Sequence, residues 1–469
     1  MLIFSSLTAF GKKHFAEVTT KTGISADSLQ PYLTTMDQTS LLAKQPKIAF
    51  KDPSTNTSAL DQINIDTATQ YQTIDGFGFC LTDGSASLIA AMAPVDRKAL
   101  LEELFGLKGD AIGISYLRIS IGASDLSDSV YTYDDMPTGK TDKNLSHFSI
   151  AKAKIHLIPL LKQILAINPA IKILGSPWSA PSWMKTNDSS KGGSLLPEYF
   201  QSYARYFVRY IKAMQKEGIR IDAITPQNEP LNPKNNPSMY MTAEDQRDFI
   251  KNNLGPAFKK ARFATKIQIY DHNADRPDYP LTILNDPAAA AFVDGSAFHL
   301  YNGKITALSA VHDSFPQKNI YFTEQYTPDN GSFAGDMRWH ISQLIIGATR
   351  NWSRNVLEWN LAIDPNLGPH TPGGCTTCLG ALTIERSLIS RNPSYYIIAH
   401  ASKFVPAGSV RIGSNEIQGV PNVAFLTPAG QKVCILVNTT DNERSFNLSY
   451  RGKTAPLTLS SGAVATLVW

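Results

Sequence analysis

Two glutamates stand where short, β-branched and aromatic stretches of this chain end. Glu229 closes the run Ile-Asp-Ala-Ile-Thr-Pro-Gln-Asn-Glu (221–229), and Glu324 closes Asn-Ile-Tyr-Phe-Thr-Glu (319–324). Such stretches are typical of the strands of a parallel α/β barrel, which presents catalytic groups at the carboxyl ends of its strands. One carboxyl group of such a pair can protonate a glycosidic oxygen, while the other attacks the anomeric carbon or activates water. The pair therefore indicates glycosidic chemistry.

Other residues suited to binding a sugar occur at or just beyond strand ends. A buried arginine is costly without a counter-charge, so we expect Arg118 to face Glu324, which must stay ionised as a nucleophile, or an aspartate in a structural pair. His299 fits a site residue and a satisfied core histidine equally well. Aromatic rings stack on sugars, and acids and amides bind hydroxyls. The candidate substrate-binding residues are Arg118, Asp125, Trp178, Asn228, His299, Tyr301, Trp359 and Asn360.

The pattern of elements predicts the barrel that would position these groups. Between residues 71 and 395, short β-rich runs alternate with segments of helical spacing such as Ile150–Ile167 and Tyr199–Glu217, which is typical of repeated βα units. Gly, Pro, Asn and Asp cluster after the runs, which predicts long loops on the functional rim. The eight predicted strands are Thr73–Leu81, Ile114–Gly122, Ile171–Pro177, Ile221–Gln227, Ile267–Asp271, Phe292–Leu300, Asn319–Thr323 and Arg354–Leu361.

The two ends of the chain predict a second, all-β unit. The N-terminal runs have no helix-rich core of their own, so a β-sandwich assembled from both termini would bury both sets at once. We expect a sandwich domain from residues 1–70 plus 396–469 and a catalytic barrel domain from 71–395. The strand-like runs are Phe15–Thr20, Lys47–Phe50, Gln62–Asp66, Lys432–Asn438, Ser445–Tyr450 and Ala463–Trp469.

Composition argues against several other classes of partner. The 469-residue chain has a net charge of +4, with its lysines and arginines spread along its length, so we expect no nucleic-acid partner. No apolar run is long enough to span a bilayer. The opening residues 1–13 lack a basic segment ahead of a short apolar patch, which fits the remnant of a trimmed signal peptide or a first strand.

Of the four cysteines, Cys375 and Cys378 are close in sequence. One Cys-x-x-Cys is a weak zinc signal because a structural zinc site needs four ligands. The spacing favours a disulfide that staples a loop, or two free thiols. Since a carboxylate pair supplies both proton transfer and nucleophile, neither a metal nor an organic cofactor is expected.

Six motifs, in order along nearly the whole chain, carry a family resemblance. Together they resemble glycoside hydrolase family 30, and within it the glucosylceramidase branch. They are Gln-Thr-Ile-Asp-Gly-Phe-Gly-Phe-Cys-Leu-Thr-Asp (72–83), Leu-Arg-Ile-Ser-Ile-Gly-Ala-Ser-Asp-Leu-Ser (117–127), Ser-Pro-Trp-Ser-Ala-Pro-Ser-Trp-Met-Lys-Thr-Asn (176–187), Gln-Asn-Glu-Pro (227–230), Phe-Thr-Glu (322–324) and Trp-Asn-Leu-Ala-Ile-Asp (359–364).

The resemblance implies a (β/α)8 barrel with a side β-sandwich built from both termini, and a retaining mechanism. Glu229 matches the acid/base of the family and Glu324 matches its nucleophile. His370 follows Gly-Pro where the lysosomal member of the branch has an asparagine, so we add it to the candidate substrate-binding residues. The positions that hold the sugar in the −1 subsite match Asp125, Trp178, Asn228 and Trp359.

These observations predict a retaining enzyme acting on β-glucosides, with glucosylceramide-like lipids as favoured substrates. An endo-acting β-1,6-glucanase is the alternative, because the same family hosts both and they share the −1 subsite. A catalytically silent carbohydrate-binding protein is a remote alternative, since both glutamates are present. We expect a carbohydrate or glycolipid partner, with transient contact with a membrane surface if it is a glycolipid, and a secreted or periplasmic location.

Overall fold

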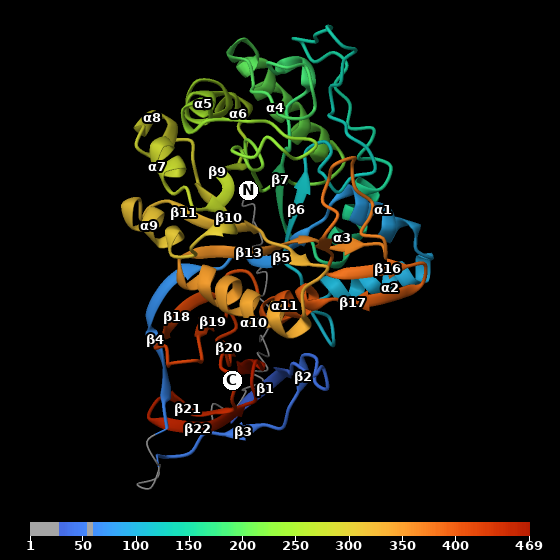
Figure 1. Cartoon of the computed structure of the whole chain (residues 1–469). Helices are drawn as coiled ribbons and strands as arrows, with labels where there is room; N and C mark the ends of the chain where they lie inside the picture. Colours follow the sequence, from blue (N-terminus) through green and yellow to red (C-terminus); the bar gives the residue numbers. More distant parts are fainter. Residues whose placement is uncertain (1–27, 54–59) are drawn as a thin grey trace, which may run out of the picture.

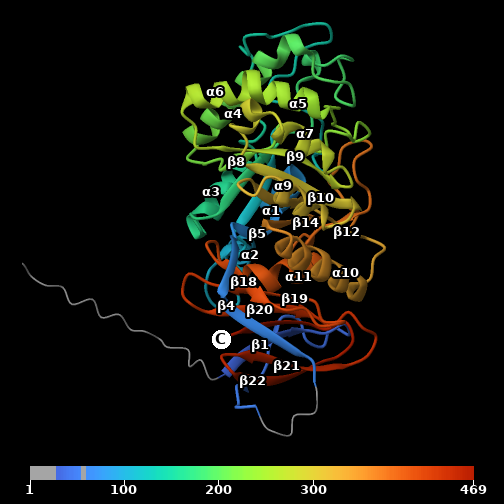
Figure 2. The ribbon, with the colours of Figure 1, turned by 90° about the vertical axis from the view of Figure 1, so that its left-hand side faces the viewer.

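A computed structural model of the protein describes residues 28–53 and 60–469. The predicted run Phe15–Thr20 and the opening residues 1–13 lie outside the described residues. Figures 1 and 2 show a barrel, coloured from blue through green and yellow to orange, stacked on a β-sandwich in which blue N-terminal strands lie beside red C-terminal ones. This arrangement agrees with the predicted fold class.

In the described part of the chain, eight parallel strands close into a barrel in the order β10-β11-β13-β5-β6-β7-β8-β9. Each overlaps one of the predicted runs. Both faces of β5 and β6 are buried, as expected for strands packed between a filled barrel and its helices. The strands are β5 (Gly76–Cys80), β6 (Tyr116–Ser120), β7 (Lys172–Ser176), β8 (Ala223–Ile224), β9 (Lys266–Ala274), β10 (Gly295–Gly303), β11 (Asn319–Glu324) and β13 (Ser353–Asn360).

The outer helices follow from amphipathic spacing. In α4 the residues Tyr203, Phe207, Tyr210 and Met214 are fully buried, and their three- and four-residue spacing puts them on one face. The helices are α1 (Asp83–Ala91), α2 (Pro94–Phe105), α3 (Leu157–Ile167), α4 (Phe200–Lys216), α5 (Ala243–Phe249), α6 (Gly255–Ala261), α7 (Asp278–Leu284), α8 (Pro287–Ala290), α9 (Ala307–Ser314), α10 (Phe333–His340) and α11 (Pro393–Ser402), with π-helical turns η3 (Ile250–Leu254) and η4 (Ile341–Ala348) and 3-10 turns η1 (Ser182–Met184) and η2 (Pro197–Tyr199).

One helix is shorter than predicted. The periodic segment was expected to be helical from Ile150, but α3 begins at Leu157, and the residues before it form turns. Ile155, which the periodicity places on the apolar face, is 62% exposed. His156, at the N-cap position, has φ −127° and ψ −50°, outside the helical region, so the helix begins after it.

The sandwich takes strands from both ends of the described chain. The long strand β4 pairs with β21 and β18 and then leads into barrel strand β5. Since β4 spans residue 70 and α11 spans residue 395, the predicted domain boundaries fall inside elements, and the division stays a prediction. The sandwich strands are β1 (Ser28–Thr34), β2 (Ala43–Lys44), β3 (Ile48–Ala49), β4 (Gln62–Thr73), β18 (Val410–Ser414), β19 (Asn422–Leu426), β20 (Lys432–Val437), β21 (Arg444–Tyr450), β22 (Lys453–Leu459) and β23 (Val464–Val468).

A buried histidine ties the barrel to the sandwich. His400 of α11 lies 2.9 Å from Thr466 Oγ1 in β23 and 2.8 Å from Thr34 Oγ1 in β1. Burial lowers the pKa of His400 to about 3, so the ring stays neutral and can donate one of these bonds and accept the other. No helix within 28–53 or 60–469 combines the length and apolarity needed to cross a membrane.

Short strands shape the loops that follow the barrel strands. The loop after β13 contains β14 (Ala362–Ile363), β15 (Cys378–Leu379), β16 (Leu382–Glu385) and β17 (Leu388–Arg391). Strand β15 pairs with β12 (Thr327–Pro328), which follows β11. This pairing joins the loops after the seventh and eighth barrel strands just beyond Glu324.

Candidate active site

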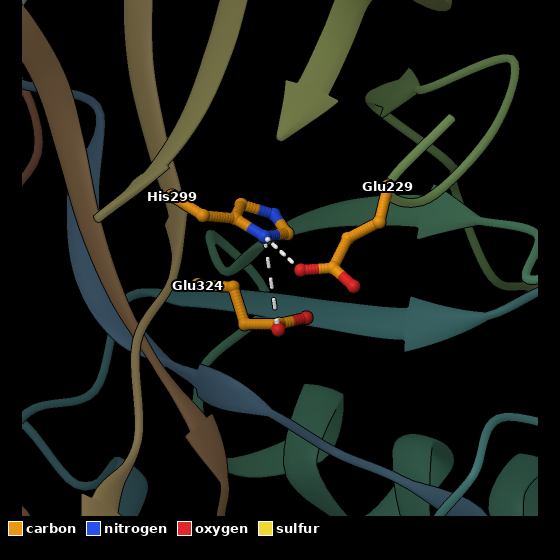
Figure 3. Close-up of side chains that lie close together, drawn as sticks. All are labelled: Glu229, His299 and Glu324. Atoms are coloured by element: carbon orange, nitrogen blue, oxygen red, sulfur yellow. Dashed lines mark hydrogen bonds and ion pairs between the residues drawn. The ribbon is translucent and has the colours of Figure 1, made fainter. Parts of the chain in front are cut away.

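The barrel brings Glu229 and Glu324 together from strands that are three apart around its rim. Glu229 follows β8, whereas Glu324 is the last residue of β11. Figure 3 shows both carboxylates turned toward the ring of His299, from β10. One ligand atom of each residue lies within 4.8 Å of the other two. The glutamates are 7% and 6% exposed, so only the edge of the site faces solvent.

The backbone at Glu229 is held in an unusual conformation. Its φ angle is +43°, in the left-handed region that non-glycine residues rarely adopt. The amide N–H of Glu229 donates to the carbonyl of Asp271 at 2.9 Å, and Asn232 Nδ2 donates to Glu229 Oε2 at 2.8 Å. Strain of this kind persists where surrounding contacts enforce it and is concentrated at functional sites.

Glu324 is held by two donors. Arg118 Nη1 donates to Oε2 at 2.5 Å, and the Tyr301 hydroxyl donates to Oε1 at 3.0 Å. Arg118 also pairs with Asp271 through Nη2 at 2.8 Å. The predicted contact between Arg118 and Glu324 is therefore confirmed, and the alternative aspartate pair exists alongside it.

Asp271, at the centre of the site, was missed by sequence reasoning. This carboxylate is fully buried in β9 and accepts bonds from Arg118, Ser176, Thr225, His299 and Thr323. Burial alone would raise the pKa of Asp271, but Arg118 and His299 outweigh it and hold the pKa well below its usual range. The available signal was its place as the last residue of a predicted barrel strand.

His299 lies between the two glutamates, whose charges favour its protonated form. Its Nδ1 lies 3.3 Å from Glu229 Oε1 and 3.7 Å from Glu324 Oε1, and its Nε2 lies 3.1 Å from Asp271 Oδ1. Burial would lower the pKa of His299, but these carboxylates raise it to about 9. His299 therefore belongs to the site and is not an isolated core histidine.

The pKa values of the two glutamates move apart. Burial opposes ionisation of Glu229, but the bond with His299 and the charge of His272 outweigh it and lower its pKa to about 2. Burial raises the pKa of Glu324, with His299 and Arg118 acting against that rise. These shifts favour a carboxylate at Glu229 beside a protonated His299.

Asp125 supplies an unused acceptor beside the pair. Asp125 is 5% exposed, and its Oδ1 has no hydrogen-bond partner among the described residues. Burial, and then the charges of Glu324 and Glu229, raise its pKa to about 7. A buried carboxylate oxygen without a partner is costly, so it suits a ligand hydroxyl.

The rings of Trp178 and Trp359 pack against the guanidinium group of Arg118. The rings of Trp178 and Trp359 lie 5.3 Å apart, and the guanidinium carbon of Arg118 lies 4.7 Å and 5.9 Å from their centroids. Both rings are nearly fully buried, and Asn360 is 2% exposed. Asn228 Oδ1 accepts from Arg118 Nη2 at 2.6 Å. The candidate residues Trp178, Trp359 and Asn228 therefore surround Arg118.

Two backbone amides of the loop after β13 form hydrogen bonds with Asp125. The amide of Thr371 donates to the Asp125 carbonyl at 2.8 Å, and that of Cys375 donates to Asp125 Oδ2 at 3.3 Å. Cys375 and Cys378 form a disulfide, which decides between the two alternatives left open by their spacing. His370 is partly buried in this loop, with Nδ1 2.9 Å from the Thr371 carbonyl.

The same cluster has ligand types that a metal ion accepts. Glu229, His299 and Glu324 converge within 4.8 Å, and Asp271 beside Nε2 would orient the imidazole as carboxylates do at metal sites. The hydrogen bonds already joining these groups suit proton transfer equally. That the reaction needs no metal stays a prediction.

Family models match both parts of the chain. The model described as the glycosyl hydrolase family 30 TIM-barrel domain matches residues 74–405, and that of the family 30 beta sandwich domain matches residues 408–467. The two models together cover most of the chain, in the order predicted from the sequence.

Individual relatives agree with these matches. An endo-1,6-beta-D-glucanase of Trichoderma harzianum is 37% identical over 85% of this chain and 83% of its own. The lysosomal acid glucosylceramidase of Mus musculus is 30% identical over 85% of this chain and 82% of its own. A solved endo-beta1,6-glucanase superposes with a TM-score of 0.87 at 37% identity, covering 94% of this chain and 99% of that one.

Proposed function

The chain belongs to glycosyl hydrolase family 30, and from that premise we propose that it is a retaining endo-β-1,6-glucanase with Glu229 as acid/base and Glu324 as nucleophile. The observation that carries this chemistry is the buried pair, whose oxygens approach within 4.8 Å. Retaining enzymes hold their carboxyl groups about 5–5.5 Å apart and inverting enzymes about 6.5–9.5 Å. An approach of single oxygens within 4.8 Å is compatible with the short separation of a retaining pair.

The first step forms a glycosyl-enzyme. Glu324 attacks the anomeric carbon while Glu229 delivers a proton to the departing glycosidic oxygen. Arg118 and Tyr301 hold different oxygens of Glu324, which orients the attack and favours the ionised nucleophile. In the second step Glu229 takes a proton from water, which attacks from the face that the leaving group vacated, and the β configuration returns.

The proton that Glu229 delivers comes from His299 in this proposal. In the free site the imidazolium faces the Glu229 carboxylate at 3.3 Å, so the proton crosses one hydrogen bond before it reaches the leaving oxygen. Esterification of Glu324 removes a charge that raises the pKa of His299, which favours release of the proton. When the glycosyl-enzyme is hydrolysed, that charge returns and His299 recovers a proton.

We assign the sugar of the −1 subsite to the residues around Arg118. Because Asn228 Oδ1 is occupied by Arg118, the amide nitrogen of Asn228 is available to donate to a hydroxyl near the anomeric carbon. Asp125 Oδ1 is an acceptor in need of a donor. Trp178, Trp359 and Asn360 complete the walls, and His370 is assigned to the leaving-group side.

The comparisons favour a β-1,6-glucan over a glycolipid. The fungal and the solved endo-1,6-glucanases are each 37% identical to this chain, and the mouse glucosylceramidase is 30% identical. The glucosylceramide preference expected from the motifs, and with it membrane contact, therefore becomes the second choice. A silent carbohydrate-binding protein is disfavoured, because Arg118, Tyr301 and His299 all engage the two glutamates.

We also propose that the enzyme works outside the cytoplasm. The Cys375–Cys378 disulfide would persist in an oxidising compartment and be reduced in most cytosols. A polymeric β-glucan is also a substrate that must be met outside the cell that secretes the enzyme.

A substrate panel tests this function. We expect linear β-1,6-glucan to be shortened to a ladder of oligosaccharides, with little action on β-1,3-glucan, xylan or glucosylceramide. NMR of the first product should show the β anomer before mutarotation. The Glu324→Gln variant is the matched control and should leave the polymer intact. Faster cleavage of glucosylceramide, or an α anomer as first product, would overturn the proposal.

A further inference from the structure

An exposed tryptophan stands near the nucleophile. Trp339 lies near the carboxyl end of α10 and is 39% exposed, whereas the other tryptophans of the chain are buried or partly buried. The helix follows β11, the strand that ends in Glu324. A single exposed indole is a common surface feature, so its surroundings decide whether it has a function.

Two adjoining hollows surround this indole. One has a volume of about 330 Å3 and the other about 440 Å3, within the range of small-molecule sites. Leu300, Tyr301 and Trp339 line both of them, so the hollows meet along that edge. We call this surface, formed by Leu300, Tyr301, Gln325, Tyr326, Asp336 and Trp339, the Trp339 groove.

The groove reaches the catalytic centre through Tyr301. The Tyr301 hydroxyl donates to Glu324 Oε1 at 3.0 Å, and its ring lies 5.4 Å from that of Tyr326. Tyr326 and Trp339 line the same hollow. A path of aromatic rings therefore leads from the nucleophile to the exposed indole.

The groove also contains a polar group that lacks a partner. Gln325 is 8% exposed, and its Oε1 makes no hydrogen bond among the described residues. Gln325 lines the hollow, and an amide oxygen without a partner can accept from a hydroxyl that reaches it. Rings that stack on C–H faces, together with amide and carboxyl groups, are the chemistry that binds a pyranose.

Ion pairs of the residues on either side of Trp339 hold the end of α10 in place. His340, beside Trp339, pairs with Glu358 at 2.7 Å, and Arg338 pairs with Asp441 at 3.2 Å. These contacts hold the end of α10 to the barrel and to the sandwich, and the Trp339 ring contacts the His340 ring at a centroid distance of 4.9 Å. The helix therefore supports an indole that is partly open to solvent.

We propose that the Trp339 groove is a distal subsite that binds a glucosyl residue of the β-1,6-glucan chain, beyond the sugar held at the −1 subsite. This inference rests on the proposed function and adds to it, because a distal subsite makes catalysis depend on chain length. Short substrates that end before the groove gain nothing from it, whereas longer chains gain affinity and position.

Chain-length kinetics test the subsite. We would compare wild type, Trp339→Ala and Trp339→Phe on an aryl β-glucoside, on short β-1,6-linked oligosaccharides and on the polymer. We expect Trp339→Ala to lose about tenfold in kcat/KM on the polymer, as for one lost stacking contact, with the aryl glucoside unchanged. Trp339→Phe should recover much of the loss. Leu388→Ala, which removes a 64% exposed side chain on β17, is the matched control and should behave as wild type.

The outcomes separate the two proposals. If wild type leaves β-1,6-glucan intact, the proposed function is wrong, and so is the proposal that a glucosyl residue of this polymer binds in the Trp339 groove. If wild type cleaves the polymer but Trp339→Ala loses equally on all substrates, or loses nothing, the subsite alone is overturned. Binding of β-1,6-linked oligosaccharides to Glu324→Gln, with and without Trp339→Ala, gives a second readout. Equal affinities would again exclude the subsite, and melting temperatures report whether each variant is folded.

Discussion

Nδ1 of His299 lies 3.3 Å from Oε1 of Glu229, and the two form a hydrogen bond. Because the pKa of His299 is raised to about 9 and that of Glu229 is lowered to about 2, the free site keeps its proton on the ring. The acid of the proposed mechanism is therefore the pair, and the pH dependence belongs to both residues together.

The alkaline limb of the pH profile should report this pair. In wild type kcat/KM should fall as pH rises past about 9, where His299 loses the proton. In His299→Gln the proton must reside on Glu229, whose pKa is below that of the imidazole, so the limb should move to lower pH. The measurement is kcat/KM on an aryl β-glucoside between pH 4 and 10.

The acid limb of the pH profile should change in that variant as well. We expect this limb to follow the ionisation of Glu324, because burial raises the pKa of Glu324 above its usual value. Losing the His299 charge should shift this limb further upward, because the imidazolium favours the ionised nucleophile. An alkaline limb that stays near pH 9 in His299→Gln would contradict the shared proton.

Asp271→Asn should damage stability and catalysis together. The variant leaves Arg118 and His299 without their shared counter-charge, and breaking a buried pair costs about 3–5 kcal/mol. We expect kcat/KM to fall about 10–100-fold, as for residues that orient catalytic groups. Asp75→Asn, at the opposite end of the barrel, breaks a partly exposed pair with Arg354 and should cost about 1–2 kcal/mol with activity intact.

The pH dependence of that destabilisation shows whether the charge of Asp271 stabilises the fold. The folded-state pKa of Asp271 lies below its unfolded value, so its stabilisation is present above about pH 4 and is lost as pH falls. The difference in melting temperature between wild type and Asp271→Asn should therefore shrink in acid. A difference that is constant down to pH 3 would mean that the charge is not what stabilises the fold.

Local pattern was enough to predict the barrel and the place of Glu324 at a strand end. Most barrel strands are buried on both faces along most of their length and appear as short runs of β-branched and aromatic residues, and Glu324 ends one such run as β11 does. The contact of Arg118 with a carboxylate followed from the cost of burying a lone guanidinium. Strand β8 is only Ala223–Ile224, shorter than its predicted run, and Pro226, which cannot donate to a strand ladder, follows it.

Contacts between distant strands could not be predicted in the same way. Asp271 gathers donors from β6, β7, β10 and β11, and no spacing along one strand encodes that convergence. The backbone amide of Cys375 donates to the Asp125 carboxylate, and the residue type at position 375 does not indicate such a backbone contact. Trp359 was predicted to bind the sugar but is 3% exposed against Trp178, because its burial depends on a residue that follows another strand.

Removing the disulfide should alter substrate binding more than chemistry. In Cys375→Ser combined with Cys378→Ser, the loop loses the constraint that holds the Cys375 amide on Asp125. A hydrogen bond of that kind contributes about 0.5–1.5 kcal/mol, so KM should rise about two- to tenfold with kcat little changed. Reduced wild type should show the same KM. A collapse of kcat, or zinc lost together with activity, would refute this assignment.

Truncation of the two glutamates should give different defects, because their proposed roles differ. Every substrate needs the nucleophile, so Glu324→Ala should be inactive even on a dinitrophenyl β-glucoside. Glu229→Ala should still form the glycosyl-enzyme from that substrate, whose leaving group departs unaided, and then release it slowly for want of a base. A burst should therefore precede slow turnover.

Azide separates the assignments most sharply. In Glu229→Ala the small anion can attack the intermediate from the face that the carboxyl group vacated, so added azide should restore turnover and yield β-glucosyl azide. General acid/base catalysis contributes about 10²–10⁴-fold to the rate. Without azide, Glu229→Ala should therefore cleave β-1,6-glucan more slowly than wild type by about that factor, whereas the rate of its burst on the dinitrophenyl glucoside should fall little. Rescue of Glu324→Ala to an α-azide is compatible with a nucleophile at that position. An α-azide from Glu229→Ala, with neither burst nor rescue of the β product, would reverse the two roles.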